Sequence, residues 1–256
     1  MKRISVLTLL IIGLAGASLA TVNLLSFQFT TLFGSNPAYV SRLLLASGFS
    51  VWAGIILGNW SLDYFGGANR EILSASAFIM AVGFGTLATV TENTPALAVG
   101  LSFLGGFGAG GIVQPATTML TIISSDELIG TIIAIALSVR IVGESIGFTI
   151  YDNVLTNKLA DILPVNVGDA AITAGLPYNQ ITTFLGTYFS TNSSALAQYS
   201  PLILQAAQEA TTTSYVVGFR LIYLISIAFG GSAVVGSLFL GDIRKHMVNR
   251  VAVDIH

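Results

Sequence analysis

Apolar residues dominate six stretches of the chain, and each stretch is long enough to cross a lipid bilayer as a helix. A membrane-spanning helix needs roughly 20 consecutive, mostly apolar residues. Segments with turn-forming or charged residues, such as 34–37 and 124–127, separate the apolar stretches. The pattern predicts an all-α membrane protein with one domain over 1–256 and spans at about 4–33, 43–62, 72–90, 96–123, 128–151 and 215–240.

The segment between the fifth and sixth predicted spans is longer and more polar than the other connections. Residues 155–214 are rich in Thr, Ser and Asn, and three prolines interrupt them. We expect this segment to form a long external loop, within which 194–212 could form a surface helix. The residues after the last span, 241–256, are predicted to form a cytoplasmic tail.

Lys and Arg residues are distributed unevenly between the two sides of the predicted spans. Cytoplasmic segments of membrane proteins carry an excess of these residues. If both termini are cytoplasmic, six Lys and Arg residues are internal and two are external, which favours this orientation. The long loop is then external, where the sequon at Asn192 would be accessible for glycosylation. The internal residues are Lys2, Arg3, Arg70, Arg244, Lys245 and Arg250, and the external ones are Arg42 and Lys158.

The N-terminal residues also imitate a cleavable signal peptide, because Lys2 and Arg3 precede an apolar run that reaches small residues at 17–20. The apolar run continues to Phe33, however, which is longer than the hydrophobic region of a typical signal peptide. We therefore expect the first span to be retained.

Composition excludes several classes of function. Charged residues make up 9% of the chain, where a soluble domain carries about 25%. The net charge of −2 offers no basic face for nucleic acid. The chain has no cysteine, and its two histidines, His246 and His256, lie in the predicted tail. We find no catalytic motif and expect no enzyme activity, no cofactor and no metal site.

Two charged residues fall inside the fifth predicted span. Arg140 lies about 18 Å along a helix that begins at Leu128, near the middle of a bilayer. An Arg at that depth costs at least about 2.5 kcal/mol and must face a helix bundle or an aqueous cavity. Glu144 follows one turn later and could pair with it. Arg140 and Glu144 are therefore candidates for a substrate or proton pathway, and a purely structural ion pair is the alternative.

Uncharged polar residues and closely spaced glycines mark other positions in the spans. Gln114, which precedes a proline, and Asn23 and Gln28 of the first span could line a pathway or could hydrogen-bond to neighbouring helices. The glycine-rich run 106–111 matches a dinucleotide-binding pattern, but it lies in an apolar helix without a preceding strand. Small residues let helices pack closely in lipid, so we assign four glycines to helix packing: Gly106, Gly110, Gly143 and Gly147.

Several stretches resemble one family of transporters. The segment 58–70 resembles the loop G-x-x-x-D-R-x-G-R of the major facilitator superfamily, with Asp63 and Gly66 in the expected places. The run 125–131 with Arg140, Gly143, Gly147 and 150–151 is similar to the penultimate helix of the fungal 14-span drug:proton antiporter-like group. Segments 219–230, 241–243 and 251–253 resemble the last helix and tail of that group, which includes trichothecene efflux pumps and siderophore-iron transporters.

The resemblance implies the C-terminal six-helix half of a proton-coupled secondary transporter. It also implies export of a toxin or drug, or uptake of siderophore-bound iron, with Asp63, Gly66 and Arg70 in a gating loop. The expected partners are the lipid bilayer, a small-molecule substrate, and either an N-terminal half of six to eight helices or a second copy. We expect a multi-pass protein, with the plasma membrane favoured over an internal one. The alternative is a truncated, non-transporting membrane protein or an accessory subunit.

Overall fold

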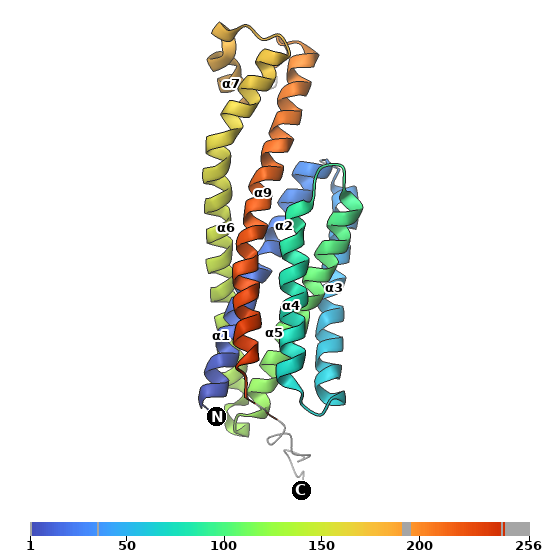
Figure 1. The fold of residues 1–256 in the computed structure, drawn as a ribbon, viewed down its shortest axis with the longest axis vertical. Coiled ribbons are helices and arrows are strands. Elements are labelled where there is room, and N and C mark those ends of the chain that lie inside the picture. Colours follow the sequence, from blue (N-terminus) through green and yellow to red (C-terminus); the bar gives the residue numbers. More distant parts are fainter. Residues whose placement is uncertain (1, 35, 191–195, 242, 244–256) are drawn as a thin grey trace.

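The computed structural model describes residues 2–34, 36–190, 196–241 and 243, which form a bundle of long helices (Figure 1). The described residues contain no strand, and six helical stretches are long and apolar enough to cross a membrane. The all-α membrane class predicted from the sequence is therefore confirmed. The six stretches are Arg3–Phe33, Pro37–Tyr64, Asn69–Thr89, Pro95–Ile122, Asp126–Thr173 and Pro201–Leu238.

The helices follow one another with short connections over most of the chain. Prolines stand at the first position of three of the long helices, where their missing N–H removes no hydrogen bond from the helix. The helices are α1 Lys2–Leu19, α2 Thr21–Phe33, α3 Pro37–Tyr64, α4 Asn69–Thr86, α5 Pro95–Ile122, α6 Ile129–Thr173, α7 Ile181–Phe189 and α9 Pro201–Leu238. Short 3-10 turns are η1 Leu87–Thr89, η2 Asp126–Leu128 and η3 Tyr178–Gln180.

The first span is divided into two helices. α1 ends at Leu19 and α2 begins at Thr21, and the Thr21 hydroxyl donates a 2.8 Å hydrogen bond to the Ser18 carbonyl. The carbonyl of Ala17 accepts a 3.0 Å hydrogen bond from the Tyr151 hydroxyl of α6. Backbone groups in lipid need a partner inside the protein, and Tyr151 supplies one at the break. The break therefore depends on a neighbouring helix as well as on local residues.

Helix α5 lies between α3 and α4 and is the most buried span, with 56% of its most apolar stretch covered, against 11% in α6. Glycines allow this close packing. A Cβ at Gly110 would overlap the carbonyl oxygen of Val51 in α3, and a Cβ at Gly108 would overlap the backbone nitrogen of Met80 in α4. Gly106 likewise lies against the Ser50 side chain of α3.

Helix α6 packs against α1 and α9. A Cβ at Gly143 would overlap the carbonyl oxygen of Gly13, and one at Gly147 would overlap that of Ala17. The two backbones of α1 and α6 are thus in direct contact, because no side chain separates them at these positions. This contact fixes where the polar residues of α6 lie relative to the first span.

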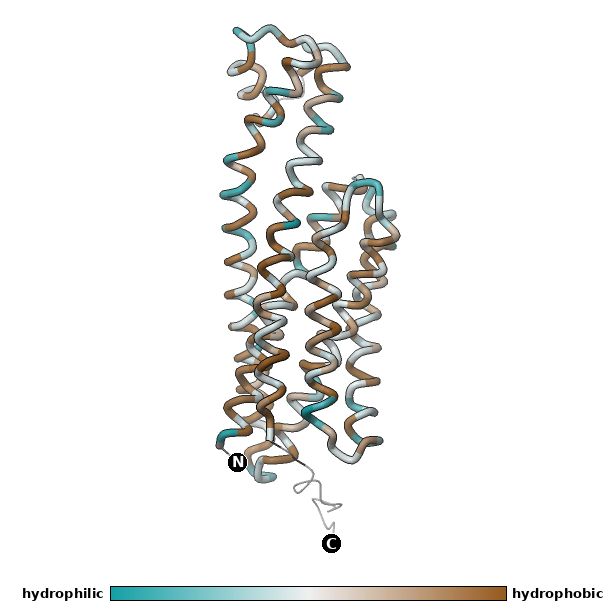
Figure 2. The backbone as a smooth tube through the Cα atoms, in the orientation of Figure 1, coloured by the Kyte–Doolittle hydropathy of each residue, from teal (hydrophilic) through white to brown (hydrophobic). Residues whose placement is uncertain are grey.

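Most of the connection over 155–214, predicted to form a loop, is helical. α6 continues to Thr173, α9 begins at Pro201, and both rise beyond the ends of α2 to α5 (Figure 1). Hydrophilic residues recur along this projecting part of α6 (Figure 2). The helices are stable here because they share with α7 a small apolar cluster that is separate from the main core: Val167, Ala171, Leu176, Phe184, Ile203 and Ala207.

Candidate functional site

A hydrogen bond joins two polar side chains from different spans. The Asn23 amide of α2 donates to a carboxylate oxygen of Glu144 in α6 at 2.9 Å. Glu144 is half-buried, whereas Asn23 is exposed on the surface of the bundle. A carboxylate within an apolar span requires such a donor, because lipid offers none. The bond therefore places an acidic side chain beside the start of α2, just after the break in the first span.

Arg140 lies one turn before Glu144 on α6 and is half-buried. Its side chain makes no ion pair with Glu144, and its buried Nε has no hydrogen-bond partner among the described residues. The expected local pair is therefore not formed, because Glu144 is held by Asn23 of α2 instead. Gly16 of α1 makes room for this turn of α6, since a Cβ there would lie 2.5 Å from the Arg140 carbonyl oxygen.

Gln28 has a different environment from Asn23, although both belong to α2. Its side chain is 1% exposed, and its amide oxygen accepts a hydrogen bond from the hydroxyl of Tyr223, a fully buried residue of α9. Gln28 thus joins α2 to α9 inside the bundle and does not face an open surface.

A second polar contact joins α3 to α5. Gln114 is exposed, while the neighbouring Pro115 is buried against Gly58 of α3, where a Cβ would lie 2.8 Å from the proline Cγ. One turn later, the Thr118 hydroxyl donates to the Asn59 amide oxygen at 2.9 Å. Gln114 therefore lies at the α3–α5 contact, whereas Arg140 and Glu144 lie at the contact of α6 with the first span.

The connection between α3 and α4 contains the three residues predicted to belong to a gating loop. Asp63, Gly66 and Arg70 are all exposed, and the turn depends on positive φ angles of 58° at Gly66 and 84° at Gly67. Asn69 is buried, and its amide donates to the Gly241 carbonyl at 2.9 Å. The loop is thereby tied to the end of the last span.

The structure brings Asn23 and Glu144 together and places Arg140 one turn away, whereas the Asn192 sequon lies outside the described residues. Sequence reasoning missed the partners Tyr223, Tyr151, Asn59 and Asn69. The available signal was a hydroxyl or amide within or at the end of an apolar span, which needs a hydrogen-bond partner. The sequence does not indicate which helix supplies that partner. Within the described residues, no group of His, Asp and Glu could hold a metal ion.

Six helical stretches that are long and apolar enough to cross a bilayer, with a polar hydrogen bond between two of them, are the architecture of a multi-pass integral membrane protein. The family model described as "Fungal trichothecene efflux pump (TRI12)" matches residues 2–256. The chain therefore belongs to this family of transporters in the major facilitator superfamily.

Individual relatives are similar at a lower level of identity. An MFS-type transporter, prx5, from Penicillium rubens is 28% identical over 230 residues, which cover 88% of this chain and 41% of the relative. The trichothecene efflux pump TRI12 of Trichoderma arundinaceum is 24% identical over a region that covers 85% of this chain and 37% of the relative. The trichothecene efflux pump TRI12 of Fusarium sporotrichioides is 21% identical over a region that covers 88% of this chain and 38% of the relative. The chain spans about two fifths of the length of these relatives.

Proposed function

We propose that the six helices form the C-terminal domain of a 14-span secondary transporter that exports a small toxic molecule. Membership of the efflux-pump family and the names of the relatives support export over the uptake of siderophore-bound iron. The observation that carries the proposal is the half-buried Arg140, whose buried Nε has no hydrogen-bond partner in the part of the chain that the structure describes. A buried guanidinium nitrogen without a partner is costly in an apolar span, and charged residues within spans often mark transport pathways.

The proposed mechanism is alternating access between two domains. Secondary transporters of this kind bind substrate near the middle of the bilayer and move one helical domain against another. The second domain would be an N-terminal half or another copy of this chain, and Arg140 would face it. The six helices by themselves supply one wall of such a pathway, so we expect them to carry no substrate flux alone.

Glu144 is our candidate for proton coupling. Its carboxylate lies in a span, is partly accessible and accepts a hydrogen bond from the Asn23 amide. Ionisable side chains within spans are typical of proton relays in transporters, and movement of α6 against α2 would break or form the hydrogen bond between Glu144 and Asn23. Glu144→Gln preserves a similar shape but removes the exchangeable charge.

Deletion of the gene in its source cells tests the export function. We expect cells that lack it to retain several times more of a radiolabelled trichothecene than cells complemented with the wild type. Uptake of a labelled ferric siderophore, measured in the same strains, separates the two substrate classes. Unchanged retention and unchanged uptake would instead support a non-transporting membrane protein. As a further check, saturable flux by the purified chain in liposomes would contradict the need for a second domain.

Cysteine labelling tests the proposed orientation, in which both termini are cytoplasmic. The chain has no native cysteine, so single cysteines can replace Tyr178 at the projecting tip and Phe65 in the α3–α4 turn, both of which are exposed. We expect a membrane-impermeant maleimide to label Tyr178→Cys in intact cells and Phe65→Cys only after permeabilisation. The reverse labelling pattern would contradict the proposed orientation and place both termini outside the cell.

A further inference from the structure

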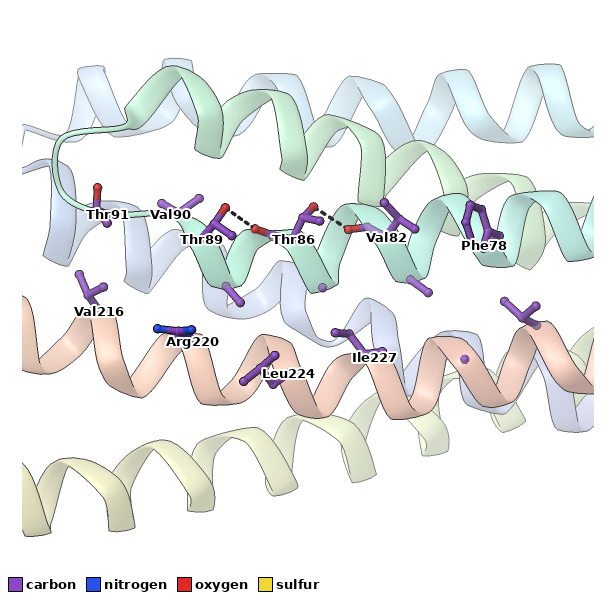
Figure 3. Close-up of a pocket in the computed structure, with 15 residues that line it drawn as sticks. Phe78, Val82, Thr86, Thr89, Val90, Thr91, Val216, Arg220, Leu224 and Ile227 are labelled. Carbon is purple, nitrogen blue, oxygen red and sulfur yellow. Dashed lines mark hydrogen bonds between the residues drawn. The ribbon is translucent and has the colours of Figure 1, made fainter.

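An apolar groove of about 760 Å³ runs between α4 with η1 and α9 (Figure 3). Phe78 and Val82 line it from α4, and Leu224 and Ile227 line it from α9. Gly231, also in the lining, has no other atom within 4 Å of a would-be Cβ, so the groove is open at that point. The space is long and hydrophobic, as a hydrocarbon chain requires.

Arg220 lies near one end of this groove, opposite Thr89 and Val90, with Thr91 and Val216 beyond it (Figure 3). Its side chain is exposed and makes no hydrogen bond or ion pair within the described part of the chain. The nearby hydroxyls of Thr86 and Thr89 donate to backbone carbonyls of their own helix, at 2.6 and 2.8 Å. The groove therefore ends in an uncompensated positive charge, with five N–H donors on its guanidinium group.

The position of Arg220 along the helix agrees with the boundary of a bilayer. It precedes Leu238, the end of α9, by 18 residues, or about 27 Å at 1.5 Å per residue. The hydrocarbon core of a membrane is about 30 Å thick. The facing stretch Asn69–Thr89 has 21 residues and ends at the level of Arg220. By these lengths, a bilayer whose boundary falls at Leu238 would have its opposite phosphates near the level of Arg220, with the apolar groove extending from there into the hydrocarbon.

We propose that this groove binds one anionic phospholipid, with an acyl chain between α4 and α9 and its phosphate at Arg220. Charge complementarity selects the occupant, because Arg220 is the one charged residue in the lining and has no partner among the described residues, while the other lining residues are apolar except for three threonines. The site is independent of the proposed transport function. Its walls come from α4, η1 and α9, which contribute neither Arg140 nor Glu144 nor Asn23.

Native mass spectrometry of the full chain, extracted from nanodiscs of phosphatidylcholine and phosphatidylglycerol, measures the bound lipid. We expect the wild type to retain one phosphatidylglycerol in preference to phosphatidylcholine. Arg220→Ala should weaken this retention about tenfold, as loss of a charge-assisted hydrogen bond implies. Retention by Arg220→Lys should lie between that of the wild type and that of Arg220→Ala, since lysine keeps the charge without the paired donors. Arg42→Ala is the matched control, because Arg42 is exposed near the start of α3, on the same side of the bundle but outside the groove.

Filling the groove tests the acyl-chain part of the proposal without changing charge. Gly231→Leu adds a side chain into open space and should reduce retention, whereas Gly100→Leu, equally unobstructed but outside the groove, should not. Equal retention of the two lipids by the wild type would overturn the proposal. So would equal losses in Arg220→Ala and Arg42→Ala, or in the two leucine variants. If the Arg220→Ala variant were not monodisperse, lipid retention by Arg220→Lys and by the two leucine variants, Gly231→Leu and Gly100→Leu, would test the proposal.

Discussion

Replacement of Gly110 by Ala is expected to destabilise the helix bundle by about 3 kcal/mol, at the upper end of the range for overpacking. The new Cβ would overlap the carbonyl oxygen of Val51 and lie 3.0 Å from the backbone nitrogen of Ile55. Both obstacles belong to the backbone of α3, which cannot move aside as a flexible side chain can. α3 and α5 would therefore have to separate along a densely packed contact.

The measurement is unfolding of the purified protein in mixed micelles by titration with a denaturing detergent. Gly100→Ala on the same helix is the control, because no atom lies within 4 Å of its would-be Cβ. Alanine favours a helix over glycine by up to about 1 kcal/mol, so the control should be neutral or slightly stabilised. A large loss of stability for Gly110→Ala with no loss for Gly100→Ala is the expected result. Equal effects would mean that α3 and α5 do not pack as described.

Arg140→Ala is expected to lower transport about 100-fold, equivalent to about 2.7 kcal/mol, without a matching loss of protein. The protein level should be maintained because Glu144 is hydrogen-bonded to Asn23 and would not be left without a partner. Transport should fall because, in the proposed pathway, the guanidinium with its buried Nε would contact the substrate or the second domain. The rate of toxin export from cells, normalised to the amount of protein, checks this.

Two further variants separate a role in transport from a structural role. Lys158→Ala removes a half-buried cation from a part of the same helix outside the proposed pathway, so it should leave export within about twofold of wild type. The double change Arg140→Ala with Glu144→Ala should retain protein but not transport. Full export by a well-expressed double variant would show that both charges are dispensable to the mechanism.

The spans could be predicted from the sequence because the length and apolarity of a membrane helix are local properties. The break after Leu19 could not, because the hydroxyl that satisfies the Ala17 carbonyl belongs to Tyr151, 134 residues away. The partner of Glu144 was missed for the same reason. Helical spacing suggested Arg140, but the structure brings Asn23 from a helix 121 residues distant in sequence.

The polar connection before the last span was misjudged for a different physical reason. Its Thr and Ser content and its prolines suggested a loop, and residues of that kind do favour turns when nothing else covers them. Here Val167, Phe184 and Ile203 bury one another, and that burial outweighs the weak local preference. Pro164 is accommodated inside α6, and Pro201 starts α9 at a position where proline is favoured.

The length of α6 has a consequence for observing motion in this protein. The same continuous helix carries Glu144 and ends at Thr173, about 44 Å away along its axis. A tilt of roughly 10° about the level of Glu144 would therefore displace the far end by about 8 Å. A spin label or fluorophore attached there would convert a small rearrangement around the half-buried Glu144 carboxylate into a distance change that spectroscopy resolves in a membrane.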